Sequence, residues 1–247
     1  YVRTDSYFDN SPLASSGLPS KNELELLNVW KDEIPAEVFT ETFTPPITDG
    51  SGNDRKNLLK AKEILEKEGW FVEDGKLVKD GKEFKFEFLI VSPSDEKIAL
   101  AYQSNLKKLG ITMDVRTVDS SQYQERLLSY DFDMIKRYWG VSLSPGNEQQ
   151  FYWGSEVGQK DGSRNYPGIN SPAVDALIEK LISATNREEL TTAIHALDRV
   201  LLWGHYVVPL YHSNKDRIAY WDFFEYPDEI PLYGIVIESW WINKDKQ

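Results

Sequence analysis

The stretch EFKFEFLIVSPSDEKIALAYQSNLKKLGITMDVRTV, residues 83–118, decides the fold class. Its first part places an apolar side chain at every second position from Phe84 to Ile90, as a half-buried strand does. A helical stretch at 95–109 follows and ends at Gly110, and a second strand is predicted at 111–118. A strand, a helix and a strand at this spacing form a right-handed βαβ unit. We therefore expect the two strands to lie parallel in one sheet.

Elements on either side extend this unit into an α/β lobe, with a mixed sheet flanked by helices. Helices are predicted at 55–68 and 120–129, from the Ser171-Pro172 opening onward, and at 187–203. Further strands are predicted at 132–138 and 206–212. The side chains expected to be largely buried are Phe86, Phe88, Ile111, Met113, Leu177 and Leu197.

The first 48 residues carry no lasting apolar period and are interrupted by prolines. Only 23–27 and 35–39 are typical of short helical turns. A long irregular segment of this kind usually lies on another surface, so we expect it to pack on a partner domain or a hinge. The chain opens at Tyr1 without a methionine or a signal peptide, which indicates a removed leader or a piece of a longer protein.

The composition excludes several classes of partner. A net charge of −12 over 247 residues argues against nucleic acid and against anionic lipid, both of which attract basic surfaces. No apolar run approaches the roughly 20 residues of a membrane span, so no direct membrane insertion is expected. Cysteine is absent, which excludes disulfides and thiol catalysis and fits a periplasmic protein.

The sequence contains no complete motif for a metal site, a cofactor site or a catalytic site. The loop at 49–53 has oxygen ligands at alternate positions, but Asp54 stands where a calcium loop needs glycine. Capping of the next helix by Asn53 or Asp54 is the better interpretation. The three histidines, His195, His205 and His212, lack zinc spacing. We therefore expect no metal, no cofactor and no enzyme, although no pattern rules out a glycosidase-type pair among the 40 acidic residues.

The segment after the strand at 132–138 is the candidate binding site. That strand ends near Trp139 and Gly140, and ligands of open α/β sheets bind beyond the carboxyl ends of the strands. Gly140 would let the backbone of an extended peptide come close. The alternative is that Trp139 and Trp153 simply fill the core of the lobe. These residues alone leave both interpretations open.

Three stretches resemble the family 5 extracellular solute-binding proteins, the oligopeptide and dipeptide receptors of ABC importers. They are LLKAKEILEKEGW (58–70), NYPGINSPAVDALIEK (165–180) and VVPLYHSNKDRIAY (207–220). Three more stretches, SPLASSGLPSKNELELL, DGSGNDRKNLLKA and SPGNEQQFYW, are similar to the branch that handles longer peptides and microcin C. The likeness covers nearly the whole chain but only the C-terminal part of such receptors.

This resemblance implies the C-terminal lobe of a type II periplasmic-binding-protein-like fold. Residues 1–48 would pack on the missing lobe or hinge, 49–230 would form the ligand-binding lobe, and 231–247 would return toward the missing lobe. The intact receptor would bind an extended oligopeptide in the cleft between its lobes and deliver it to an inner-membrane ABC permease. It would be periplasmic, or extracellular and membrane-anchored in a Gram-positive source. The alternative is a carbohydrate-binding lobe or a glycosidase fragment, because Trp and Tyr rings also stack on sugars.

The resemblance also places the site residues. The family's Trp-x-x-Asp, whose Asp pairs with the peptide amino group, corresponds to Trp139–Ser142, so Ser142 stands where that Asp is expected. Glu148 is the candidate replacement for the missing carboxylate. The residues expected to line the site are Trp139, Gly140, Val141, Ser142, Asn147, Glu148, Trp153 and Tyr166.

Overall fold

The alternating stretch forms the central strand of a three-stranded parallel sheet in the computed structural model, which describes residues 1–52 and 54–246. The strand order is β6-β5-β7, so β5 pairs with both neighbours. The predicted βαβ unit is confirmed, with β5 (Lys85–Ile90), α4 (Pro93–Lys107) and β6 (Thr112–Thr117). The third strand is shorter than expected. Only Met134–Ile135 (β7) of 132–138 pairs with β5.

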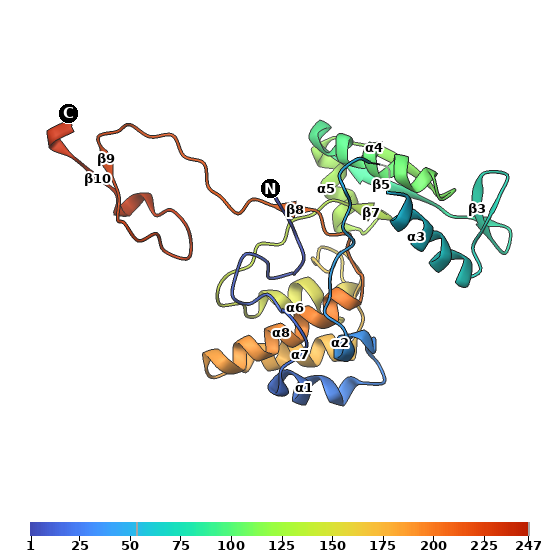
Figure 1. Ribbon diagram of the computed structural model, residues 1–247, viewed down its shortest axis with the longest axis horizontal. Coiled ribbons are helices and arrows are strands. Elements are labelled where there is room, and N and C mark those ends of the chain that lie inside the picture. Colours follow the sequence, from blue (N-terminus) through green and yellow to red (C-terminus); the bar gives the residue numbers. More distant parts are fainter. Residues whose placement is uncertain (53, 247) are drawn as a thin grey trace.

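Side chains of β5 alternate between two hydrophobic clusters, one on each face of the sheet. Phe88 and Ile90 pack with Ala99 and Leu106 of α4 on one face. Leu89 points to the other face, where it packs with Tyr123 and the rest of the cluster around α5 (Ser120–Leu128). The helix α4 thus packs on one face of the sheet and α5 on the other, and both lie beside the parallel strands in Figure 1.

The helical part forms a separate hydrophobic cluster that the sequence did not distinguish from the sheet core. Leu177 and Leu197 are buried as predicted, but they pack in this helical cluster rather than under the sheet. Phe88, Ile111 and Met113 are buried in the sheet part, while Phe86 is only half-buried. The helices of this cluster are α1 (Lys21–Leu27), α2 (Glu37–Thr40), α6 (Glu148–Trp153), α7 (Pro172–Ile182) and α8 (Arg187–Trp203).

The N-terminal segment packs on α8 through a buried carboxylate. Asp198 accepts hydrogen bonds from the Ser6 hydroxyl (2.8 Å), the Tyr7 backbone N–H (2.8 Å) and both the backbone N–H and the hydroxyl of Ser15 (2.9 and 2.7 Å). Phe8 and Leu13 are buried beside it in the helical cluster. This segment therefore has a partner within the chain, and its expected contact with another lobe or hinge stays a prediction.

A small antiparallel sheet precedes the parallel one. It comprises β2 (Phe71–Glu73), β3 (Lys76–Lys79) and β4 (Lys82–Glu83) in the order β2-β3-β4. Before it, α3 (Arg55–Lys67) is capped by Asp54, whose side chain accepts from the Asn57 N–H at 2.9 Å. The predicted capping role is confirmed for Asp54, whereas Asn53 lies outside the described residues.

The chain then leaves the helical part through a pair of short strands. Of the strand predicted at 206–212, only β8 (Tyr211–His212) forms, antiparallel to β1 (Val2–Arg3). Beyond it, the C-terminal arm (residues 213–246) extends away from the rest of the molecule (Figure 1). The arm contains the last elements, β9 (Phe224–Glu225), η3 (Ile237–Ser239), β10 (Trp241–Ile242) and η4 (Lys244–Lys246).

Candidate functional site

The parallel strands bring the residues after β5, β6 and β7 to one edge of the sheet. At this edge Lys136, directly after β7, forms an ion pair with Asp95 in the first turn of α4. Both side chains are largely buried. Burial disfavours the ammonium, but the hydrogen bond to Asp95 outweighs it and raises the pKa of Lys136, so Lys136 stays charged. The pair ties the end of β7 to the start of α4.

The exit segment, residues 136–142, runs from this edge to the helical part. The guanidinium carbon of Arg137 lies 4.8 Å from the centre of the Tyr166 ring, beside the cluster around α5. Two residues later, the ring of Trp139 packs on Trp153 of the helical cluster, with the ring centres 5.1 Å apart. The exit segment therefore bridges the sheet part and the helical part. The side chains of Arg137 and Trp139 pack against Tyr166 and Trp153, respectively.

Tyr166 is held in place by the residue before it. The buried side chain of Asn165 donates to the carbonyl oxygens of Gly154 and Ile169, at 3.0 and 2.8 Å, and accepts from the Ile169 N–H at 2.8 Å. These bonds close the loop between α6 and α7. They explain why the stretch NYPGINSP needs an asparagine at its start, and they give Arg137 a fixed aromatic partner.

The structure brings the rings of Trp139 and Trp153 together, but Trp153 is buried. Its side chain is only 2% exposed, and its indole N–H donates to the Gln149 side chain at 3.0 Å. Trp153 therefore supports Trp139 from behind and presents no surface to a ligand in this structure. Gln149, which completes this support, was missed at the level of sequence. The only sequence signal was its spacing of four residues from Trp153 on one helix.

The backbone from Gly140 to Ser142 is exposed beyond Trp139. A Cβ atom added to Gly140 would meet nothing within 4 Å, so the chain's own packing does not require glycine there. Val141 is 38% exposed, and the hydroxyl of Ser142 accepts from the Ser144 N–H at 3.1 Å. The open space at Gly140 is what an approaching ligand backbone would need.

Glu148 and Asn147 lie at the start of α6, and neither side chain forms a hydrogen bond with the indole nitrogen of Trp139, which is unpaired among the described residues. The carboxylate of Glu148 accepts from the Gly146 N–H, at 2.9 and 3.1 Å to its two oxygens, and is half-buried. Asn147 is exposed and makes no capping hydrogen bond with its side chain. The structure thus orients the Glu148 carboxylate without neutralising it with a cation among the described residues.

Arg137 is one of the residues of the exit segment that the sequence did not single out. Its Nε atom is fully buried and has no hydrogen-bond partner within 1–52 and 54–246, and the same holds for the indole nitrogen of Trp139. No local pattern marks such a residue, because an unpaired donor is visible only in three dimensions.

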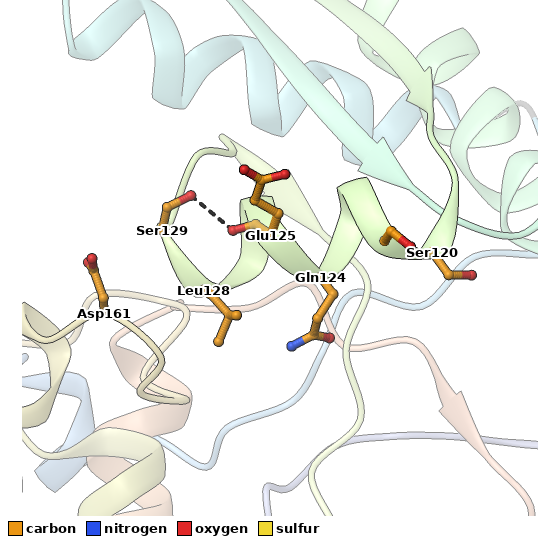
Figure 2. A pocket seen from close by; sticks show the side chains of 7 residues that line it. Ser120, Gln124, Glu125, Leu128, Ser129 and Asp161 are labelled. Carbon is orange, nitrogen blue, oxygen red and sulfur yellow. Dashed lines mark hydrogen bonds between the residues drawn. The ribbon is translucent and has the colours of Figure 1, made fainter.

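A surface depression lies elsewhere on the sheet part. It measures about 670 Å³ and runs along one side of α5, where the side chains of Gln124 and Leu128 extend outward near Asp161 (Figure 2). None of its lining residues belongs to the predicted site. It is an open surface rather than an enclosed cavity, so its geometry fixes no ligand.

Other kinds of site find no support in the part of the chain that the structure describes. There, no cluster of three or more His, Asp and Glu side chains is placed to hold a metal ion. Within the same residues, no helix is long and apolar enough to cross a bilayer.

Comparison with known proteins identifies the family. Residues 29–161 match the family model described as bacterial extracellular solute-binding proteins, family 5 middle. The chain is 49% identical over 244 residues to the uncharacterized protein y4wM of Sinorhizobium fredii, covering 98% of this chain and 37% of that protein. It is 42% identical over 247 residues to the probable peptide-binding protein YejA of Agrobacterium fabrum, covering 99% and 40%.

A solved structure shares the fold. The oligopeptide-binding protein AppA of Bacillus subtilis, in complex with a nonapeptide, superposes with a TM-score of 0.60 and 22% identity, over 90% of this chain and 45% of AppA. The expected type II periplasmic-binding-protein-like fold is confirmed. The chain spans only about two fifths of the length of the two curated relatives.

Proposed function

The chain belongs to the family 5 bacterial extracellular solute-binding proteins, and from this premise we propose that it is the second lobe of a two-lobed receptor for extended oligopeptides. The receptor would work by binding alone, in the periplasm or outside the cell, and would hand its ligand to an ABC permease. Support comes from the family itself and from the names of YejA and AppA, which refer to peptides.

The observation that carries the proposal is the exposed backbone at Gly140. An extended peptide binds a receptor through main-chain hydrogen bonds, which requires its backbone to approach another backbone closely. The space beside Gly140 is empty, and the exit segment carrying it lies at the carboxyl edge of a parallel sheet. The ligand surface would comprise Trp139, Gly140, Val141, Ser142, Asn147, Glu148 and Tyr166, with Trp153 behind it.

The site is open because one wall is absent from this chain. A two-lobed receptor encloses its ligand by hinge closure, and each lobe alone presents a face rather than a cavity. We assign residues 1–48 and 231–247 partly to contacts with the other lobe. The arm supports this assignment because it carries exposed apolar side chains such as Leu232 (84%), Tyr233 (73%) and Ile237 (69%).

A thermal-shift screen of the intact receptor tests the proposal. Peptides of three to nine residues should raise its melting temperature, and oligosaccharides should not. Gly140→Ala should leave the unliganded protein equally stable, because the added methyl group meets nothing, yet it should weaken peptide binding by at least about tenfold. Leu128→Ala, in the depression on α5, is the matched control and should bind normally. Stabilisation by sugars alone would overturn the proposal.

The partner of the peptide amino group has a separate test. If Glu148 takes the place of the carboxylate missing at Ser142, Glu148→Gln should weaken free-amine peptides more than their acetylated forms. Equal effects on both forms would remove Glu148 from that role and leave peptide binding itself standing.

A further inference from the structure

We propose that His212 and Asp9 form a pH-sensitive latch between the strand that leads into the C-terminal arm and the N-terminal segment. His212 is the last residue of β8, and the arm begins directly after it (Figure 1). Asp9 follows Phe8 in the segment that packs on α8. The latch itself does not depend on peptide binding, whereas its effect on the opening of a two-lobed receptor rests on the proposed function.

The first observation is the contact itself. The Nδ1 atom of His212 lies 3.3 Å from the Oδ2 atom of Asp9, and it shares a hydrogen bond of 3.3 Å with the hydroxyl group of Thr4. One ring nitrogen therefore faces two partners of different chemistry. Without a proton, Nδ1 accepts from the Thr4 hydroxyl, and with a proton it donates to the Asp9 carboxylate. The protonation of this nitrogen thus decides which partner it binds.

The second observation is that the carboxylate of Asp9 is held in place. Its Oδ2 atom accepts from the Asp5 N–H at 3.1 Å, and its Oδ1 atom accepts from the Asn10 N–H at 2.8 Å. The neighbouring Phe8 is buried in the helical cluster, so the turn that carries Asp9 is anchored to the rest of the molecule. A carboxylate that is already fixed loses little side-chain freedom when it binds a cation.

The third observation concerns the strand pair around His212. β8 runs antiparallel to β1, with His212 opposite Val2 and Tyr211 opposite Arg3. Side chains alternate between the two faces of a strand pair, so the side chain of Arg3 points to the opposite face from that of His212. Among residues 1–52 and 54–246, Asp9 is thus the charged group that contacts the His212 ring. The two side chains are only 24% and 22% exposed, which limits screening of the pair by salt.

From these contacts we expect the latch to fasten as the pH falls. Histidine is the side chain whose charge ordinarily changes between pH 5 and pH 8. At the acid end, the imidazolium and the Asp9 carboxylate attract each other, whereas at the alkaline end the ring keeps only a neutral hydrogen bond. The N-terminal segment and the arm are both assigned to contacts with the other lobe, so acid should stiffen the junction between them.

Hydrogen exchange of the peptide-free intact receptor, followed by mass spectrometry, tests the latch. The reporters are the fragments that contain β1 and β8, since the Thr4 N–H donates to the Leu210 carbonyl oxygen at the end of this strand pair. Labelling times are scaled for the intrinsic exchange rate at each pH. Exchange in these fragments should then be about fivefold slower at pH 5 than at pH 8, the factor that a partly exposed ion pair can supply.

Four variants separate the latch from a general effect of charge. His212→Gln keeps a partner for the Thr4 hydroxyl but carries no charge, so it should abolish the pH dependence. Asp9→Asn should abolish it as well. His212→Lys stays charged at both pH values and should keep exchange slow at both. Asp5→Asn is the matched control, because it removes an exposed charge from the same segment, and it should retain the dependence of the wild type.

The outcomes separate the latch from the receptor. Equal exchange of β1 and β8 at both pH values in the wild type, or a full pH dependence in His212→Gln, would overturn the latch and leave the peptide receptor standing. Loss of the dependence in Asp5→Asn would also overturn it, because net charge would then be responsible. Failure of the intact receptor to bind peptides in a titration would overturn the proposed function and leave the latch standing. Circular dichroism checks each fold, and Asp9→Asn provides the reading if His212→Gln does not fold.

Discussion

The indole ring of Trp139 packs against that of Trp153, with the ring centres 5.1 Å apart and the planes inclined by 39°. The two rings differ in what else they touch. Trp153 is buried in the helical cluster and bonded to Gln149, whereas Trp139 is half-buried on the exit segment. The inner ring therefore belongs to the core, and the outer ring belongs to the candidate site.

This arrangement predicts that Trp153→Ala mainly lowers the stability of the fold, whereas Trp139→Ala mainly weakens peptide binding. Trp153→Ala should lower the free energy of unfolding by about 3–5 kcal/mol, the usual loss for a large buried aromatic side chain. Trp139→Ala should lower it by less, about 1–2 kcal/mol, because less apolar area is buried there. In the intact receptor, Trp139→Ala should also weaken peptide binding by about tenfold or more.

Urea unfolding of residues 1–247 measures the two stabilities. Trp221→Ala is the matched control, since that ring is 74% exposed and its loss should change little. Equal destabilisation by Trp139→Ala and Trp153→Ala would place both rings in the core and remove Trp139 from the site.

A buried ionic cluster joins the N-terminal segment to α8. Arg199 Nε lies 2.6 Å from Glu23 Oε2, and His195 Nδ1 lies 3.6 Å from Glu23 Oε1. Burial opposes ionisation of Glu23, but hydrogen bonds from His195 and Arg199 outweigh it and lower the pKa of Glu23 from 4.5 to about 2. The hydrogen bond to Glu23 raises the pKa of His195 above 6.5, against the effect of burial.

These shifts predict a maximum in stability at mildly acidic pH. The contribution of Glu23 is present above its unfolded pKa of 4.5 and is lost as the pH falls toward 2. The contribution of His195 is present below 6.5 and is lost as the pH rises through its raised pKa. The free energy of unfolding should therefore be highest between pH 4.5 and 6.5, so far as these two groups determine it.

Thermal melting across this pH range checks the prediction. His195→Asn should flatten the fall on the alkaline side, and Glu23→Gln should flatten both sides. His205→Asn is the control, because its ring contacts Phe43 and Trp203 and no carboxylate among the described residues. An unchanged alkaline fall in His195→Asn would show that another group is responsible.

The C-terminal arm is predicted to be dispensable for the fold of this chain. Its ring contacts, such as Tyr220 with Trp240 at 5.0 Å and Tyr226 with Trp240 at 5.2 Å, stay within the arm. Deleting 217–247 should therefore shift the melting temperature by less than about 3 °C, roughly the effect of 1 kcal/mol at this size. The deletion should also reduce self-association in sedimentation experiments, because it removes exposed apolar side chains. A drop of 10 °C or more would make the arm part of the core.

The sequence predicted the elements whose patterns are local. The βαβ unit and the helices α3, α7 and α8 follow from apolar periods and from caps such as Ser171. The small sheet β2-β3-β4 was missed although its signal was present. Asp74-Gly75 and Asp80-Gly81 both have positive φ at each residue, as two-residue hairpin turns require.

Long-range contacts could not be predicted in the same way. The hydrogen bond between Ser6 and Asp198 joins residues 192 positions apart, so no local sequence pattern predicts that the N-terminal segment packs on α8. In the candidate site, the strand-end argument and the family resemblance predicted Trp139 and Gly140, whose role in binding stays a prediction. They could not show that Trp153 lies behind Trp139, or that the Nε atom of Arg137 lacks a hydrogen-bond partner among the described residues, because burial and pairing depend on the assembled fold.

The most direct test of the central claim compares peptide binding by residues 1–247 with binding by the intact receptor. A lobe that supplies half of the favourable contacts should turn a micromolar ligand, at about −8 kcal/mol, into a roughly millimolar one at about −4 kcal/mol. Calorimetry should therefore detect peptide binding by the intact receptor and none by the isolated chain. Sub-micromolar binding by residues 1–247 alone would contradict the account, because it would show that this chain is a complete receptor.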